Sequence, residues 1–357
     1  MNITTTALLA ATLAILTAYL ATPLVIRLAK RIGIIDDPAK STHPKVIHKY
    51  PVPRGGGLAI YAGVLITSLI FLPIDKYLVS ILLGAGVMVG VGILDDKYNL
   101  NPYVRLAAGL FAASIPIVAG IGIAFITNPF NGIIDLSHPR LTFELLGEIR
   151  SIWVLSDLFA LVWIVFMMNI LNMGAKGVDG QLPGVAAIAA LTIAAISFKF
   201  SADITQWPVI ILALITAGAF LGFLPWNFYP QKIMPSYGGA ALAGYLLAIL
   251  SILSTAKVGT LAIVLAVPLV DTGYTIVRRI SSGKSPVWGD TGHLHHRLLK
   301  LGWSKPKVAV FYWVVSAGLG ALALNLNSVN KFYTIVSVAL ILGGVILWLT
   351  YRPGLKN

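Results

Sequence analysis

Asp95 and Asp96 are adjacent carboxylates at the end of an apolar stretch, residues 78–94, that contains no charged side chain. Two neighbouring carboxylates repel each other unless a cation or a proton joins them. An ionisable pair at the mouth of a membrane helix is costly and indicates a functional site. Because the chain has only 13 acidic residues against 26 basic ones, two acids in succession predict divalent-metal or phosphate chemistry.

Three closely spaced histidines form a second candidate group: His293, His295 and His296, with Arg278 and Arg279 upstream. Three such imidazoles are compatible with a zinc site. The many cations nearby make the segment better suited to an anion such as phosphate. At this density, we interpret the histidines as functional rather than structural.

A glycine-rich segment, residues 166–188, carries the third group. Asn169 and Asn172 are three residues apart, so they share one face of a helix. Lys176 and Asp179 are the only charged residues in this part of the chain. A glycine-rich turn with one lysine can hold phosphate through backbone N–H groups, although the GxxxxGK[ST] pattern is absent. The alternative is that the glycines only interrupt two helices.

Two further loops contribute polar residues. The loop at 34–61 offers Lys45, His48 and Arg54 as phosphate ligands, and its prolines and glycines stiffen and turn the backbone. The alternative for this loop is a basic segment that faces the membrane. The loop at 222–245 offers Asn227 and Ser236 but contains no acid.

The composition is that of an all-α, polytopic membrane protein. The 357 residues are 57% hydrophobic and 11% charged, whereas soluble domains carry about 25% charged residues. A span needs about 20 apolar residues, which predicts 10–11 transmembrane helices in a single domain, residues 1–357. The chain has no cysteine, which excludes disulfides and thiolate metal sites. The candidate spans are 5–26, 57–73, 78–94, 103–126, 151–171, 183–199, 207–225, 238–255, 257–277, 307–326 and 331–350.

The distribution of cations predicts the orientation of these spans. With the N-terminus outside, most lysines and arginines fall in inner loops, which agrees with the excess of cations found in cytoplasmic loops. The exceptions are Lys76, Arg140, Arg150, Lys199, Lys257 and Lys331. We therefore expect a multi-pass protein of the plasma membrane with its active-site loops facing the cytoplasm. The basic excess is explained by this topology and by attraction to anionic lipid or phosphate, so nucleic acid is not implied.

The candidate residues gather on the inner side, which weakens a transporter interpretation. A transporter places its substrate site near the middle of the membrane, whereas here the acids and histidines avoid the centres of the spans. The outer loop, residues 127–150, shows no such group and is predicted to be a short lid or an amphipathic hairpin. A transport or non-catalytic protein for an anionic lipid phosphate or nucleotide remains the alternative function.

Taken together, the inner loops resemble the polyprenyl-phosphate N-acetylhexosamine-1-phosphate transferase superfamily, glycosyl transferase family 4. The resemblance is strongest over residues 34–299, and residues 307–350 add two further spans. The HLHH form of the last loop is closer to the enzymes that start O-antigen and teichoic-acid synthesis than to the peptidoglycan translocase. The matching segments are Asp36–Pro38, His48–Gly56, Asp95–Asp96, Asn169 and Asn172, Val178–Gly180, Asn227 and Pro230, Asp271–Thr272, Arg278–Arg279, Ser285–Pro286 and His293–Leu299.

The resemblance implies a reaction and a set of roles. A polyprenyl phosphate attacks the β-phosphate of a UDP-sugar, UMP leaves, and a polyprenyl-diphosphate-sugar remains in the membrane. Mg²⁺ or Mn²⁺ is the implied cofactor, a homodimer is possible, and the first membrane step of cell-surface glycan synthesis is the implied process. Asp96 would bind the metal, and Asp95 would bind it or accept a proton. The remaining roles are phosphate binding by Arg279, His293, His295 and His296, and nucleotide binding by Asn172, Asp179 and Asn227.

Two positions depart from the family pattern. Lys176 stands where the family's D-G-x-D-G segment has an acid, and Ser236, or Tyr237 in another register, stands where the family's later M-G-D-x-G-S segment has a metal-binding aspartate. Three interpretations follow. Lys176 replaces part of the work of the metal, or Mg²⁺ remains with looser protein ligation, or the chain binds its ligands without turnover.

Overall fold

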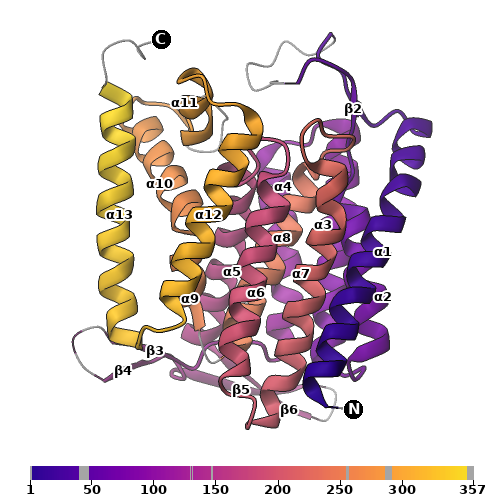
Figure 1. Cartoon of the computed structure of the whole chain (residues 1–357). Coiled ribbons are helices and arrows are strands. Elements are labelled where there is room, and N and C mark those ends of the chain that lie inside the picture. Colours follow the sequence, from indigo (N-terminus) through magenta and orange to yellow (C-terminus); the bar gives the residue numbers. More distant parts are fainter. Residues whose placement is uncertain are drawn as a thin grey trace.

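The computed structural model describes residues 2–39, 48–128, 130, 132–145, 148–254, 257–285 and 292–351. Long helices run side by side through most of its height (Figure 1). Helix α1 (Ile3–Arg31) begins at one end of the bundle, and α13 (Ser328–Tyr351) ends at the other. The end at which α3 (Lys76–Tyr98) and α13 finish also carries α11 (Leu294–Lys300), and we call it the site end. The all-α prediction is confirmed.

The helices of the described residues are α1 (Ile3–Arg31), α2 (Gly57–Phe71), α3 (Lys76–Tyr98), α4 (Pro102–Val118), α5 (Val154–Gly174), α6 (Gln181–Phe198), η1 (Ile204–Gln206), α7 (Trp207–Asn227), α8 (Ser236–Leu253), α9 (Lys257–Val264), α10 (Ala266–Ser281), α11 (Leu294–Lys300), α12 (Lys305–Ala323) and α13 (Ser328–Tyr351). Each of the eleven predicted spans coincides with one of these helices or, at 257–277, with two of them. Eight are long and apolar enough to cross a membrane, judged within the described part of the chain.

Three predicted spans differ in detail from the structure. Helices α9 and α10 meet at an angle of 81° across a short break, which is the geometry of a broken span or of a re-entrant loop. Helices α2 and α4 are shorter apolar helices, and α4 ends at Val118, well before the predicted residue 126. Beyond α4 the chain turns at Gly120, which has a positive φ of 109°, and leaves the helical bundle.

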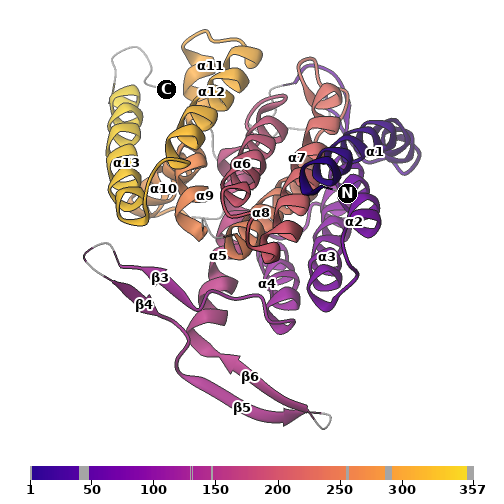
Figure 2. The same ribbon diagram turned by 60° about the horizontal axis from the view of Figure 1, so that its bottom comes forward.

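Two β-hairpins occupy the end of the bundle opposite the site end (Figures 1 and 2). Strands β3 (Phe125–Thr127) and β4 (Ile133–Asp135) form the first, and β5 (Arg140–Leu145) and β6 (Glu148–Trp153) form the second. Leu141 and Phe143 share one face of β5, while Arg140, Thr142 and Glu144 share the other. The second hairpin is therefore amphipathic, as predicted. Near the site end, β1 (Ile35–Asp36) pairs with β2 (Val52–Pro53).

Small residues let the helices approach one another closely. Ala7, Ala10, Ala14 and Ala18 form a fully buried stripe along α1. On the facing helix, α7, a Cβ added at Gly222 would lie 2.2 Å from the carbonyl oxygen of Ile15. Such contacts are typical of helices that pack within a membrane.

The end of α3 is set by local signals that also place the aspartate pair. Asp75 caps the first turn by accepting a hydrogen bond from Leu78 N at 2.8 Å. Asn99 ends the helix in the left-handed conformation, with φ 51°. Asp95 and Asp96 therefore lie in the last turn. One turn earlier in α3, a Cβ added at Gly92 would lie 2.3 Å from Gly238 Cα, so the backbones of α3 and α8 are in contact there.

Candidate active site

Each carboxylate of the aspartate pair lies against an arginine from another segment. Asp96 Oδ1 is 3.0 Å from Arg54 Nη2, and Asp95 Oδ2 is 3.4 Å from Arg105 Nη1. Both aspartates are buried, with 1% and 8% of their surface exposed for Asp95 and Asp96. Arg105 is held in turn by Tyr237, whose ring lies 5.3 Å from the guanidinium carbon. The pair is thus balanced by fixed cations.

Asp96 is surrounded by polar groups from three further segments. Arg54 and Lys176 attract its carboxylate, and the Ser236 hydroxyl lies beside it. Ser236 is the first residue of α8 and has a left-handed φ of 60°, which is uncommon for a residue other than glycine. Its hydroxyl accepts a hydrogen bond from Gly55 N at 3.3 Å. This contact ties the loop before α2 to the start of α8.

The glycine-rich segment after α5 is held by its own hydrogen bonds. Gln181 Oε1 accepts from Gly177 N at 3.0 Å and from Val178 N at 3.1 Å. Gly180 N donates to Asn227 Oδ1 at 3.1 Å. These three N–H groups therefore do not face a ligand, and the predicted backbone cradle for phosphate is wrong for them.

The two asparagines on α5 have different surroundings. Lys176 Nζ donates to Asn172 Oδ1 at 2.8 Å, which orients the lysine at the site. Asn169 is exposed, and its side chain donates to Val165 O on its own helix at 2.8 Å. The structure therefore joins Asn172 to the site and leaves Asn169 apart from these contacts.

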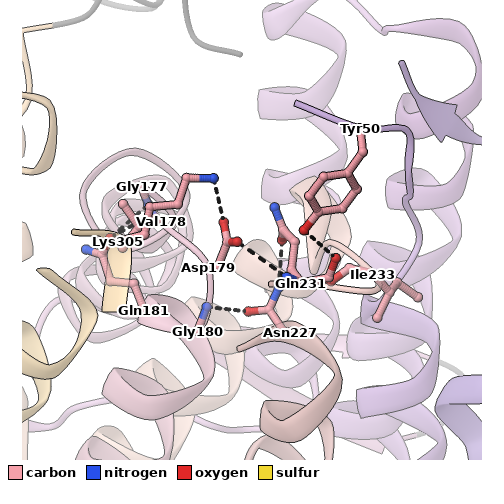
Figure 3. A network of polar contacts seen from close by, with 10 residues as sticks. All are labelled: Tyr50, Gly177, Val178, Asp179, Gly180, Gln181, Asn227, Gln231, Ile233 and Lys305. Atoms are coloured by element: carbon pink, nitrogen blue, oxygen red, sulfur yellow. Dashed lines mark hydrogen bonds and ion pairs between the residues drawn. The ribbon is translucent and has the colours of Figure 1, made fainter. Parts of the chain in front are cut away.

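Asp179 is the centre of a second polar network (Figure 3). Its carboxylate lies 3.4 Å from Lys305 Nζ and accepts a hydrogen bond from Gln231 N at 3.4 Å. Tyr50 OH donates to Gln231 O at 3.1 Å. Burial and then the nearby Asp179 and Tyr229 raise the pKa of Tyr50 above its ordinary value, so the phenol remains a donor. This network joins the loop before β2 to the loop after α7.

Asn227 fixes this network in place. Its Nδ2 donates to Gln231 Oε1 at 3.1 Å and to Ile233 O at 2.9 Å, while its Oδ1 accepts from Gly180 N. Asn227 is 2% exposed. Its side chain therefore positions the two loops that carry Asp179 and Gln231.

The histidine segment is anchored to α10 by a buried acid. Asp271 Oδ2 lies 2.9 Å from His293 Nδ1, and Asp271 Oδ1 accepts a hydrogen bond from Leu294 N at 2.7 Å. Asp271 is fully buried. An ionised carboxylate can only accept hydrogen bonds, so this contact assigns the ring proton to Nδ1. Asp271 thus orients His293 and holds the first residue of α11.

The three imidazoles lie beside one another, with the first pair stacked and the second pair tilted by 43°. The rings of His293 and His295 are nearly parallel, with centroids 5.6 Å apart, and His295 and His296 have centroids 4.2 Å apart. Arg279 is buried, with 3% of its surface exposed. A Cβ added at Gly292 would lie 1.8 Å from Arg278 Nη1, so Arg278 packs against the start of this segment. Arg278 and the histidines therefore form one basic cluster, and Arg279 is the next residue of α10.

Gly177 connects the histidine cluster to the lysine at the aspartate pair. A Cβ added at Gly177 would lie 2.2 Å from His295 Cγ. We expect Gly177→Ala to displace His295 and to lower turnover by about 10–100-fold, because small misplacements of binding groups can cost that much. Steady-state turnover of purified protein measures the effect.

Gly273→Ala is the matched control, because an added Cβ at Gly273 meets nothing within 4 Å. This variant should keep wild-type turnover. Equal activities for the two variants would contradict a role for the close contact between Gly177 and His295.

The aspartate pair is the best candidate for a metal site. Within the part of the chain that the structure describes, no three acidic or histidine side chains gather closely enough to hold a metal ion by themselves. Both oxygens of Asp96 are buried, with Oδ1 paired to Arg54 and the Ser236 hydroxyl beside the carboxylate. Mg²⁺ is often held by one or two carboxylates together with substrate phosphates. The residues therefore fit a Mg²⁺ ion whose ligands come partly from the protein and partly from a substrate phosphate.

Some predicted site residues lie elsewhere. His48 is buried, and its Nε2 is 3.3 Å from Asp36 O, so it anchors the loop before β2. Lys45 lies outside the described residues, as does Pro286 of the matching segment Ser285–Pro286. Sequence reasoning did not single out Arg105, Lys305, Gln181 or Gln231. Gln181 lies two residues after Asp179 and Gln231 four residues after Asn227, whereas Arg105 lies ten residues after Asp95 and Lys305 follows the histidine segment.

Comparisons with known proteins agree with this geometry. A model of glycosyl transferase family 4 matches residues 78–255. A probable undecaprenyl-phosphate N-acetylglucosaminyl 1-phosphate transferase of Bacillus subtilis is 33% identical over 311 residues, which cover 84% of this chain and 79% of the relative. A decaprenyl-phosphate N-acetylglucosaminephosphotransferase of Mycolicibacterium smegmatis is 28% identical over 372 residues, covering 95% of this chain and 87% of the relative. An undecaprenyl-phosphate alpha-N-acetylglucosaminyl 1-phosphate transferase of Escherichia coli K12 is 27% identical over 319 residues, covering 84% and 78%.

Proposed function

The chain belongs to glycosyl transferase family 4, and we propose that it transfers a sugar 1-phosphate from a UDP-sugar to a polyprenyl phosphate. The sugar is an N-acetylhexosamine, the products are polyprenyl-diphosphate-sugar and UMP, and the reaction is the first membrane step of a cell-surface glycan pathway. The observation that carries this proposal is the paired aspartates, each facing an arginine, joined through Lys176 and Gly177 to three histidines at one end of the bundle.

The proposed reaction exchanges one phosphorus–oxygen bond for another. An oxygen of the lipid phosphate forms a bond to the β-phosphorus of the donor, and the bond from that phosphorus to the bridging oxygen breaks, so that UMP leaves with the electron pair. Phosphoryl transfer of this kind depends mainly on positioning and on neutralising charge. A phosphate monoester with a second pKa of about 6 is already largely ionised near neutral pH. A strong general base is therefore not required.

The cations of the site neutralise the diphosphate. Arg54 and Arg105 lie beside the two aspartates, and Lys176 is oriented toward the same place by Asn172. An ammonium group acts on phosphate as a compact point charge. We assign to Lys176 part of the positive charge that a metal ion, held by a further acid, would otherwise bring to the diphosphate. We assign phosphate binding also to the histidine cluster and to Arg279.

Asp95 and Asp96 are the residues that would hold Mg²⁺. When bound, the ion would supply positive charge that helps to neutralise the diphosphate. The protein itself holds Asp96 in place through Arg54 and Ser236 and keeps both of its oxygens buried. Asp179 and Asn172 are the proposed contacts of the nucleotide, and Asn227 positions Asp179.

The chain is a multi-pass membrane protein, and we place its site end on the cytoplasmic side. The cation distribution of the sequence supports this orientation, and UDP-sugars are cytoplasmic metabolites. The same proposal makes polyprenyl phosphate the lipid acceptor and the plasma membrane the location of the protein. The homodimer stays a prediction.

The function is tested by transfer of labelled sugar 1-phosphate from a panel of UDP-N-acetylhexosamines to polyprenyl phosphate, with and without a chelator. We expect labelled lipid product from at least one donor, loss of product with chelator, and recovery on adding Mg²⁺. Product formed at the same rate in chelator would contradict the assignment of Mg²⁺ to Asp95 and Asp96, but not the transfer reaction itself. No product with any donor, in lipid that preserves the fold, would show a binding protein instead.

A further inference from the structure

A pocket of about 720 Å³ opens beside the Asp179 network at the site end of the bundle. Its walls come from three segments: the last turns of α1, the loop that leads into β2, and the loop after α7. Pro53 lines this pocket, whereas the next residue, Arg54, pairs with Asp96. The pocket and the aspartate pair therefore lie on different sides of this short segment.

The pocket is cationic. Arg27 and Lys30 enter it from α1, and Lys232 enters it from the loop after α7. No acidic residue lines it. Among the described residues, no carboxylate forms an ion pair with any of these three cations. Three basic side chains that converge on one hollow without acids favour an anionic ligand.

The remaining walls are apolar and aromatic. Pro23 and Ile26 of α1 and the indole of Trp226 line the same hollow. Trp226 is fixed by a hydrogen bond from its Nε1 to Tyr19 O at 3.1 Å, and Lys232 Nζ lies 5.1 Å from the centre of its ring. Tryptophan and basic residues at the end of a span are typical of the depth of lipid headgroups.

Helix α1 places this pocket at the margin of the bilayer. Leu20, Leu24 and Leu28 on the same helix are exposed to the surroundings of the bundle, at 63%, 60% and 44%. In a membrane these side chains contact acyl chains. A hollow next to them, with cations at its mouth and an apolar wall from the same helix, matches a lipid with an anionic head rather than a soluble nucleotide.

The pocket is connected to the site by two hydrogen bonds (Figure 3). Tyr50 and Gln231 both line it. Tyr50 OH donates to Gln231 O, and Gln231 N donates to Asp179 Oδ2. A ligand held against Tyr50 and Lys232 would therefore restrain the loop before β2 and the loop after α7, and the second of these donates the Gln231 hydrogen bond to Asp179.

We propose that this pocket binds the phosphate headgroup of an anionic membrane phospholipid, which stabilises the loop carrying Tyr50 and the loop carrying Gln231 at the edge of the active site. The headgroup phosphate lies among Arg27, Lys30 and Lys232, and its acyl chains run along the exposed face of α1. The effect on turnover rests on the function proposed above, whereas the binding itself does not.

Native mass spectrometry of the purified full chain tests the binding, with phosphatidylglycerol and phosphatidylcholine as probes. Wild-type protein should retain phosphatidylglycerol in preference to phosphatidylcholine. The triple variant Arg27→Gln, Lys30→Gln and Lys232→Gln should bind phosphatidylglycerol on the order of 100-fold more weakly, because each cation near an anionic lipid contributes about fivefold. The matched control, Arg31→Gln, Lys97→Gln and Lys307→Gln, removes three exposed cations outside the pocket and should bind as wild type does.

A second measurement separates this lipid from the acceptor substrate. In nanodiscs, phosphatidylglycerol should raise the turnover of the wild type and of the control, but not of the pocket variant, and the KM for polyprenyl phosphate should not change. Retention of phosphatidylglycerol by the pocket variant at the wild-type level overturns the proposal. A raised KM for polyprenyl phosphate with unchanged phosphatidylglycerol binding also overturns it, since the pocket would then serve the acceptor. If no donor supports transfer, the mass-spectrometric measurement still decides whether the pocket binds phosphatidylglycerol.

Discussion

Replacing Asp96 with asparagine should lower the rate of sugar-phosphate transfer by about 100–1,000-fold, the loss typical of removing one preorganised charge-stabilising group. The amide has nearly the same shape, so the packing of α3 against α8 is preserved. It removes the negative charge that faces Arg54 and replaces one carboxylate oxygen with an NH₂ group that cannot bind a cation. The loss should appear mainly in kcat, because the missing charge acts on the reacting diphosphate.

The measurement is single-turnover transfer in the presence of saturating donor and Mg²⁺. Asp75→Asn is the matched control: it lies at the other end of the same helix, and asparagine caps a helix as well as aspartate does. Asp75→Asn should therefore keep full activity. An active Asp96→Asn protein that still needs Mg²⁺ would remove Asp96 from the proposed metal site.

Replacing Asp271 with asparagine should lower turnover on the order of 1,000-fold while leaving the bundle folded. The new amide can still accept from Leu294 N through its oxygen, but its nitrogen cannot accept the proton of His293 Nδ1. His293 then loses both its orientation and its buried hydrogen-bond acceptor. A comparable loss follows when a carboxylate behind a catalytic histidine is removed in serine proteases.

This second effect is measured by pairing turnover with thermal unfolding in detergent. Asp157→Asn is the control, because that carboxylate also accepts a backbone hydrogen bond, from Trp153 N, at the end of the bundle away from the site. It should change neither activity nor the histidine cluster. If Asp271→Asn is as active as Asp157→Asn, then His293 does not depend on its buried partner.

Local signals in the sequence were sufficient to predict the spans and the position of the aspartate pair. The apolar run that precedes Asp95 is long enough to cross a membrane, and Asn99 followed by Pro102 marks its end. The histidines and Asp271 could be assigned to the same side because their loops alternate with spans. These features depend on residues close together in the chain, so they can be read from the sequence alone.

The partners of the site residues could not be predicted in this way. Lys305 meets Asp179 across 126 positions of the chain, and Tyr50 meets Gln231 across 181. Such contacts are set by how the helices pack, and packing here depends on backbone contacts such as that between Gly92 and Gly238. The use of Gln181 to satisfy the N–H groups of Gly177 and Val178 was equally hidden, since the glycines themselves suggested an open loop.

The pairing of each aspartate with an arginine has a thermodynamic consequence for the proposed reaction. Asp95 and Asp96 have protein counterions before any substrate arrives. A diphosphate that draws Arg54 and Arg105 to itself leaves the two carboxylates uncompensated, and this raises their affinity for a divalent cation. Donor and cation affinities are then linked, and each must strengthen the other by the same factor. The chain would therefore select the donor as its metal complex over either component alone.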